Sequence, residues 1–226
     1  MAFYEPGISP HGMAKDPFKS TVVPRPIGWI SSMNKDGTTA NLAPYSQFMH
    51  ATYDPPYIMF AANEKTAPDA QGDRKDNVVN IERTQEFCWS LATYELREEM
   101  NKSSTEVPYG TDEFELAGLE KQYGHLVKCP MVKRSPVKFE CRLHQILRLP
   151  GNSPGASVDI VIGRVVGIHI DESVITDGQI DITKTQPVAR CGGPNYAVVR
   201  ETFKMATPKA PVNGNGELAS AEPKTV

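Results

Sequence analysis

The sequence predicts a mainly β domain, an antiparallel β-barrel with a few peripheral helices. Three observations lead to this fold class. Residues 158–170 (VDIVIGRVVGIHI) form the longest run rich in β-branched side chains, which is typical of a core strand, and Gly163 and Gly167 within it permit the bends that closing a barrel requires. Residues 137–143 alternate apolar or small side chains with charged ones, as a half-exposed strand does. Between the two segments, residues 151–157 (GNSPGAS) have the composition of a hairpin turn.

The chain before the first strong strand is rich in proline and glycine. We expect residues 1–20 to be an irregular arm, which either wraps the surface or a partner subunit or is a loose terminus. Within it, residues 18–23 are expected to begin a short strand that leads to a Pro-Arg-Pro sequence, which confines the chain to an edge or a strand start. The folded domain should span residues 21–204. Residues 205–226 lack apolar periodicity and are expected to be a disordered tail.

A hairpin and a buried strand follow the arm. Residues 26–33 (PIGWISSM) are apolar or small and indicate a strand, and residues 38–43 resume extended chain. Between them, Asp36-Gly37 supplies the positive φ angles that a tight turn needs. After an Asp-Pro-Pro break, residues 57–60 (YIMF) are expected to form a buried strand.

Three later segments carry helical signals. Asp76 or Asn77 can cap a helix with an apolar face. Residues 94–101 place apolar side chains four positions apart, and residues 112–123 predict a short helix with its own cap. A further strand is expected at residues 86–92.

The composition indicates one ordinary globular domain and narrows the classes of function. With 226 residues, 39% hydrophobic content and a net charge of −3, the chain is a poor candidate for binding nucleic acid or an anionic membrane. No apolar run approaches the roughly 20 residues of a transmembrane helix, and no signal peptide is visible. The four cysteines lie far apart, without metal-binding spacing, so we expect no metal site and reduced thiols in the cytoplasm. Cys88 and Cys141 fall within expected strands, as buried apolar side chains.

The stretch from residue 25 to residue 60 carries most of the functional signal. After the hairpin, residues 45–48 (YSQF) place small polar groups and backbone amides beside aromatic faces. Such a surface suits a planar heterocycle with an anionic tail, because amides bind ring edges and hydroxyls bind phosphate. The helix start at residues 75–77 adds backbone amides and a lysine charge, which also suit phosphate; a capped surface helix with a solvated lysine is the structural alternative.

Nine segments occur in a characteristic order over residues 22–200. They are RPIGWISSM, the Asp-Gly turn, NLAPYSQF, DPPYIMF, KDNVVNI, MNKSS, DEFELAGL, SPVKFECRL and PVARCGGPNYA. No single segment is specific, but their joint order and spacing resemble the flavin reductase-like, FMN-binding split-barrel family (the flavoredoxin and NAD(P)H:flavin oxidoreductase type). The resemblance implies a split barrel, bound FMN and a homodimer with its flavin sites at the subunit interface.

The resemblance also implies which residues contact FMN. The end of the first strand should face the ribityl chain or phosphate, the segment after the second strand should line the ring, and the helix start should hold the phosphate. The expected contacts are Ser31, Ser32, Met33, Ser46, Gln47, Phe48, Asn63, Lys75, Asp76, Asn77, Ser103 and Ser104. This chain departs from the family pattern at residues 45–48 (YSQF), where many relatives have Asn-Ser-Phe, and at Asn77, which replaces threonine. Ordinary strand-end and loop hydrogen bonds are the structural alternatives.

Two arginines and a tyrosine are candidates for binding an anionic substrate. Arg25 could approach a flavin edge or a phosphate, Arg190 could bind a nicotinamide phosphate or an acidic substrate, and Tyr196 could stack on a ring. The structural alternatives are an arginine at a sheet edge for Arg25, a structural ion pair for Arg190 and a core aromatic side chain for Tyr196. Residues 187–197 are rich in glycine but do not open a helix after a strand, so a Rossmann site is not supported.

The leading hypothesis, which rests on the resemblance, is an oxidoreductase that transfers hydride from NADH or NADPH to FMN. The cofactor carries that chemistry, so no side-chain acid or base is required and no catalytic residue is named. Electrons could pass on to a nitroaromatic acid, or reduced flavin could be supplied to a monooxygenase. The alternative is a non-catalytic split barrel that holds FMN or haem, and a structural dimer that has lost flavin is a weaker third hypothesis.

Overall fold

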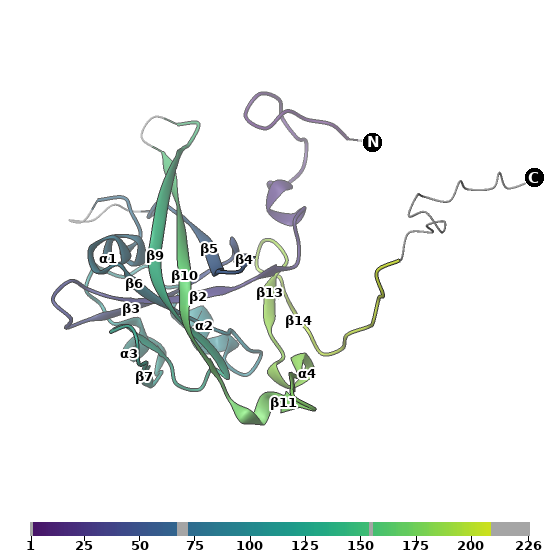
Figure 1. Cartoon of the computed structure of the whole chain (residues 1–226). Coiled ribbons are helices and arrows are strands. Elements are labelled where there is room, and N and C mark those ends of the chain that lie inside the picture. Colours follow the sequence, from purple (N-terminus) through teal and green to yellow (C-terminus); the bar gives the residue numbers. More distant parts are fainter. Residues whose placement is uncertain (1, 67–71, 154–155, 209–226) are drawn as a thin grey trace, which may run out of the picture.

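The computed structural model describes residues 2–66, 72–153 and 156–208, and its largest element is one antiparallel sheet of seven strands (Figure 1). The strands pair in the order β3-β2-β6-β9-β10-β5-β4. Within the described chain the pairing does not continue from β4 back to β3, so the barrel is split. This confirms the predicted fold class. The strands are β2 (Gly28–Met33), β3 (Ala40–Tyr45), β4 (Phe48–Tyr53), β5 (Pro56–Asn63), β6 (Glu86–Ser90), β9 (Val137–Pro150) and β10 (Ser157–Ile170).

Shorter elements flank this sheet. Strands β1, β13 and β14 form a second sheet, and two further ladders pair β7 with β8 and β11 with β12. The helices are short and peripheral. Their bounds and those of the small strands are η1 (Phe18–Ser20), β1 (Arg25–Pro26), α1 (Asp76–Thr84), α2 (Arg97–Lys102), α3 (Glu113–Ala117), β7 (Lys121–Tyr123), β8 (Pro130–Val132), η2 (Glu172–Val174), β11 (Ile175–Thr176), β12 (Gln179–Ile180), α4 (Ile182–Thr185), β13 (Val188–Arg190) and β14 (Tyr196–Val198).

The long β9–β10 hairpin bends where its two glycines lie. The register shifts between Ile162 and Gly163 and again between Val165 and Gly167, which confirms the predicted bends. At Gly163 the strand also passes so close to β6 that a Cβ atom would lie 2.2 Å from the ring of Phe87. Glycine is therefore required there by close packing as well as by the bend.

Both faces of β2 are buried, and this fixes where the core sits. Ile30 packs inside the barrel with Phe60, whereas Trp29 packs in an outer cluster with Phe114 of α3. A run of apolar and small residues without polar alternation is what a strand covered on both faces needs. The predicted turn between β2 and β3 is also confirmed, because Gly37 adopts a φ of 76°.

Four predictions about local structure are wrong. Neither Asp76 nor Asn77 caps α1, because the N-cap is Lys75, without a side-chain cap hydrogen bond, and Asp76 is already the first helical residue. Residues 18–23 contain the 3-10 helix η1 and no strand. The helix expected over residues 112–123 stops after five residues because Gly118 takes a φ of 73°, and β7 follows it. The segment 137–143 is not half-exposed: Glu140 is 1% exposed, because the loop between β7 and β8 covers it and donates backbone hydrogen bonds to its carboxylate.

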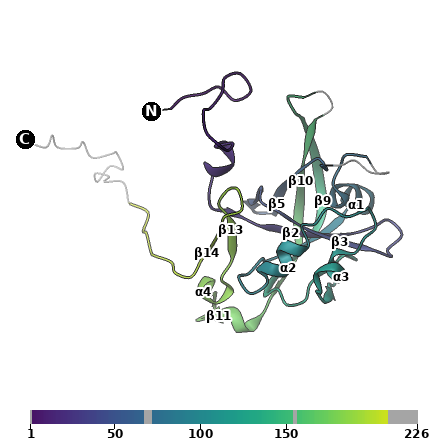
Figure 2. The ribbon, with the colours of Figure 1, turned by 180° about the vertical axis from the view of Figure 1, so that it is seen from behind.

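Both ends of the described chain extend away from the barrel on the side of β13 and β14 (Figures 1 and 2). Residues 2–17 and 199–208 contain no helix or strand. The predicted disordered tail lies outside the described residues from residue 209 onward. None of the helices described is long and apolar enough to cross a membrane.

Candidate functional site

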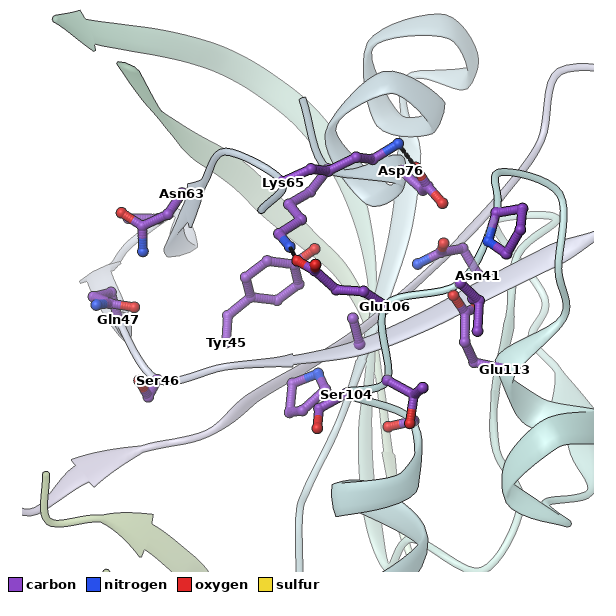
Figure 3. Close-up of a pocket in the computed structure, with 18 residues that line it drawn as sticks. Asn41, Tyr45, Ser46, Gln47, Asn63, Lys65, Asp76, Ser104, Glu106 and Glu113 are labelled. Carbon is purple, nitrogen blue, oxygen red and sulfur yellow. Dashed lines mark hydrogen bonds and ion pairs between the residues drawn. The ribbon is translucent and has the colours of Figure 1, made fainter. Parts of the chain in front are cut away.

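A cavity of about 500 Å³ lies beside the ends of β3 and β5 and the first turn of α1 (Figure 3). One wall is β3 with the turn that follows it, and another is the loop between α2 and α3. Glu113 of α3 completes the lining. The cavity is therefore built from parts of the chain that are far apart in sequence.

Seven of the twelve expected FMN contacts line this cavity. They are Ser46, Gln47, Asn63, Lys75, Asp76, Ser103 and Ser104. The hydroxyl of Ser103 accepts a hydrogen bond from the indole of Trp29 and donates to the carbonyl of Met100, and Ser104 Oγ donates to the carbonyl of Asn101. These two serines are thus already partnered within the protein. The fold brings the predicted segments together, and their contacts with FMN stay a prediction.

Ser31, Ser32 and Asn77 are fully buried and do not line the cavity: Ser32 and Asn77 lie between β2 and α1, whereas Ser31 lies on the opposite face of β2, against β8. Ser31 Oγ donates to the carbonyl of Pro130, and Ser32 Oγ donates to Asn77 Oδ1 at 2.6 Å. The amide nitrogen of Asn77 donates to the carbonyl of Ile30 at 3.2 Å. The hydrogen bonds of Asn77 to Ser32 and Ile30 fix α1 against β2, and that of Ser31 ties β2 to β8. The expectation that they face a ribityl chain or a phosphate does not agree with this placement.

Met33 and Phe48 also lie outside the cavity lining. Met33 packs against the apolar clusters on the outer face of β2. The Phe48 ring stacks on Trp89, with 5.5 Å between ring centroids and 10° between planes. Phe48 therefore anchors the start of β4, directly after the turn that carries two of the lining residues, and its contact with a flavin ring stays a prediction.

Two lysines and two carboxylates form ion pairs in the cavity wall. Lys65 Nζ lies 2.6 Å from Asp76 Oδ1, and the Lys75 ammonium is hydrogen-bonded to Glu106. The hydrogen bond from Lys75 holds the pKa of Glu106 below its usual value. Lys75 is also the N-cap of α1, where the helix dipole favours an anion. Sequence reasoning missed Lys65 and Glu106, because both lie in polar loops without a periodic signal.

Glu113 is the buried carboxyl group of the cavity, and it is 4% exposed. The backbone amide of Leu42 donates to its Oε2 at 3.0 Å, and no cation of the described chain pairs with it; Lys121 pairs instead with the neighbouring Asp112. Burial raises the pKa of Glu113 to about 8, so the group is a neutral acid at pH 7. Burial likewise raises the pKa of Tyr45, whose hydroxyl stays neutral. No pattern in the sequence marked Glu113.

The donor set of this cavity fits a planar heterocycle with an anionic tail. Its volume lies within the range of roughly 300–1,000 Å³ that is usual for small-molecule sites. Figure 3 shows Ser46, Gln47 and Asn63 on one side of Tyr45 and Asp76 on the other. The first group can hydrogen-bond the edge of a ring, and the lysines beside α1 can bind phosphate.

A second cavity of about 470 Å³ lies where the start of α2 meets β13 and β14. It contains two of the predicted substrate-binding residues, Arg190 and Tyr196. The Arg190 guanidinium carbon lies 4.7 Å from the centroid of the Tyr196 ring, and Nη1 donates to the Tyr196 hydroxyl. Both side chains are thus separated from the first cavity in this chain.

Arg25 lines neither cavity. Its Nη1 donates to the carbonyls of Lys19 at 2.9 Å and Val22 at 2.8 Å, which ties the N-terminal arm to β1. These contacts are those of an edge arginine, and an approach of Arg25 to a flavin edge or a phosphate stays a prediction.

The cysteines and acidic residues form no metal site in the part of the chain that the structure describes. All four cysteines are free, and Cys88 and Cys141 are fully buried, as their strand positions predicted. Burial raises the pKa values of both thiols, so they stay protonated.

Comparison with known proteins identifies the family. The family model described as "Flavin reductase like domain" matches residues 20–183. An uncharacterized protein from Aquifex aeolicus is 32% identical over 176 residues, which cover 77% of this chain and 84% of the relative. An uncharacterized protein from Deinococcus radiodurans is 33% identical over 193 residues, covering 82% and 81% of the two chains.

Solved structures agree with this match. Nitrilotriacetate monooxygenase component B from Bacillus cereus superposes with a TM-score of 0.80 at 29% identity, over 91% of this chain and 98% of that one. The 2-nitrobenzoate 2-nitroreductase of Pseudomonas fluorescens gives a TM-score of 0.71 at 25% identity, over 84% and 88%. These findings support a flavin-related oxidoreductase activity. With a model match over most of the folded chain and relatives above 30% identity, this protein belongs to the flavin reductase-like family.

Proposed function

We propose that the protein is an FMN-binding oxidoreductase that takes hydride from NADH or NADPH. The observation that carries this proposal is the composition of the first cavity. It combines ring-edge hydrogen-bonding groups around Tyr45 with two lysines at the N-terminus of α1. A flavin needs the first set for its heterocycle and the second for its phosphate.

The chain's own residues bind and orient the cofactor in this proposal. Lys65 and Lys75 hold the phosphate beside α1, and Ser46, Gln47 and Asn63 bind the polar edge of the ring. When bound, FMN supplies the hydride-accepting chemistry, and the cavity fixes its position and limits access of water. A catalytic side chain is not needed for this step.

The electron acceptor in this proposal is either a nitroaromatic compound or the flavin used by a monooxygenase. Support comes from two solved structures at 25% identity or more, one a nitrobenzoate reductase and the other a monooxygenase component. Anaerobic reduction of the FMN-loaded protein by NADH or NADPH, followed by addition of 2-nitrobenzoate or free FMN, distinguishes the two. If bound FMN is reduced by neither nucleotide, the protein is a non-catalytic FMN-binding module.

A homodimer with the flavin site at its interface completes the proposal. The edge strand β4 begins three residues after Tyr45 and exposes Met49 (53%) and Tyr53 (82%), which a second subunit would cover. Met49→Glu should shift the protein to monomer in analytical ultracentrifugation and weaken FMN. Leu116→Glu, at a residue that is 48% exposed on α3, is the matched control. A wild-type protein that sediments as a monomer and still binds FMN contradicts the dimer.

Substitution of Lys75 tests the cofactor assignment directly. Lys75→Ala should weaken FMN far more than riboflavin, because only FMN carries the phosphate. Lys35→Ala, at an exposed lysine in the β2–β3 turn, should leave both affinities unchanged. Equal weakening of FMN and riboflavin would remove Lys75 from the phosphate site, and failure of the wild-type protein to bind either would remove the proposed function.

A further inference from the structure

The loop between α2 and α3 forms one wall of the first cavity, where residues 103–108 are part of the lining. Among the described residues, the backbone hydrogen bonds of this loop run to α2, to α3 or stay within the loop. Side chains connect it to α1: the Tyr109 hydroxyl donates to Asn80 Oδ1 at 2.8 Å, and Glu106 contacts Lys75. Of these two side chains, Glu106 lies in the cavity lining, and Figure 3 shows it pointing into the cavity from the loop.

The Glu106 carboxylate takes up the kinds of donor that a phosphate would need. It is hydrogen-bonded to the ammonium of Lys75, the N-cap residue of α1. Its Oε1 also accepts from the backbone amide of Thr66 at 3.3 Å and from the Thr66 hydroxyl at 3.2 Å. An ammonium, a backbone amide and a hydroxyl are the groups that commonly bind phosphate oxygens. An anion that belongs to the protein itself therefore lies where the anionic group of a ligand would bind.

The two ion pairs in the cavity wall differ in how easily they can separate. The side chains of Lys65 and Asp76 are 9% and 11% exposed, and Asp76 is fixed in the first turn of α1. Separating this buried pair would leave charges without water around them, which is costly. The side chains of Lys75 and Glu106 are 28% and 46% exposed, and pairs of this kind contribute little free energy. Because Glu106 also lies on a loop, it is the carboxylate that a ligand can displace.

We propose that Glu106 is an internal substitute for the phosphate of the ligand: it occupies Lys75 in the empty cavity, and a bound phosphate displaces it. Displacement breaks one of the two side-chain ties between the loop and α1, so a phosphate-bearing ligand moves this wall and a ligand without phosphate leaves it in place. Glu106 thus sets how strongly the site prefers a phosphate. That the phosphate belongs to FMN rests on the proposed function, whereas displacement by phosphate itself does not.

Affinities for FMN and riboflavin, measured by quenching of flavin fluorescence, test the competition. Glu106→Gln should tighten FMN about two- to fivefold, the usual range for a partly exposed ion pair, and leave riboflavin unchanged. The matched control is Glu120→Gln, because Glu120 is 69% exposed and pairs with Lys133 at 2.5 Å outside the cavity. In a Lys75→Ala background Glu106→Gln should bring no gain, since the two anions compete for that lysine.

The pKa of Glu106, measured by NMR titration of its carboxyl carbon in the full chain, tests the displacement. In the ligand-free protein Lys75 holds this pKa below its ordinary value of 4.5, so Lys75→Ala should raise it and Lys133→Ala should not. FMN should raise it in the same way, and riboflavin should not. If the protein binds neither flavin, the proposed function fails, and the titration is done with inorganic phosphate, which should still raise the pKa of Glu106.

Three results would overturn the proposal. The first is a pKa of Glu106 that stays low when FMN, or inorganic phosphate in its place, is bound, because the carboxylate would then remain on Lys75. The second is weaker FMN binding by Glu106→Gln, which would make Glu106 a support of the ligand. The third is an equal gain from Glu106→Gln with and without Lys75, which would reduce its effect to general repulsion between two negative charges.

Discussion

Replacing Glu113 with glutamine should change how stability depends on pH. The side chain is buried and has no cation partner among the described residues, so burial raises its pKa to about 8 from an ordinary value of 4.5. Between these two values the folded state binds a proton that the unfolded state does not. The free energy of unfolding therefore falls as pH rises through this window.

The size of the effect follows from the two pKa values. One pKa unit corresponds to about 1.4 kcal/mol, so the wild-type protein should lose about 3 kcal/mol between pH 4.5 and pH 7 and about 5 kcal/mol in total above pH 8. Glutamine is neutral at every pH and keeps an oxygen that can accept the Leu42 amide. Glu113→Gln should thus match the wild type near pH 5 and exceed it increasingly as the pH rises.

Urea unfolding of both proteins at pH 5, 6, 7 and 8 measures this difference. The matched control is Glu115→Gln on the same helix, where the side chain is 80% exposed and no growing difference is expected. A difference between Glu113→Gln and wild type that stays constant with pH would refute the reasoning. It would mean that Glu113 is ionised in the folded protein and held by a partner.

Other substitutions test the packing around the first cavity. Asn77→Ala removes the acceptor of the buried Ser32 hydroxyl, which keeps only the hydrogen bond donated by Asn80, and should cost about 1–3 kcal/mol in urea unfolding, while the preference for FMN over riboflavin persists. Gly163→Ala places a methyl group 2.2 Å from the Phe87 ring and should cost about 1–3 kcal/mol in the same assay. Burial raises the pKa of Glu140, but hydrogen bonds from three backbone amides and a histidine outweigh this effect and lower the pKa to about 2. The wild-type protein should therefore lose stability relative to Glu140→Gln as the pH falls from 4.5 toward 2.

The fold could be predicted from the sequence because its signals are local. The Asp-Gly turn, the β-branched run of β10 and its two glycines each act within a few residues, and the structure confirms them. Prediction failed where distant contacts decide the outcome. Glu140 follows an alternation that indicates exposure, yet a loop that is not adjacent in sequence covers it. The end of α3 at Gly118 could have been predicted, since helices commonly end at a glycine.

The site was only half predictable, for a related reason. A strand's period of two shows that Ser31 and Ser32 point to opposite faces, but it does not show which face meets the cavity when both faces are buried. Asn77 did carry a signal: it lies one position before Val78 and four before Ile81, on the same buried helix face. Residues from the polar loops could not be placed by any local pattern.

The neutral state of Glu113 also bears on how the first cavity can hold a phosphate. Its lining contains Lys65 and Lys75 against Asp76, Glu106 and Glu113, so protonation of Glu113 leaves the charges balanced, and ionisation leaves an excess of negative charge. Binding of a phosphate dianion should therefore weaken as the pH rises past about 8. FMN should lose more affinity than riboflavin between pH 7 and pH 9, and Glu113→Gln should abolish that extra loss. An extra loss that persists in the variant would show that another group titrates at the phosphate.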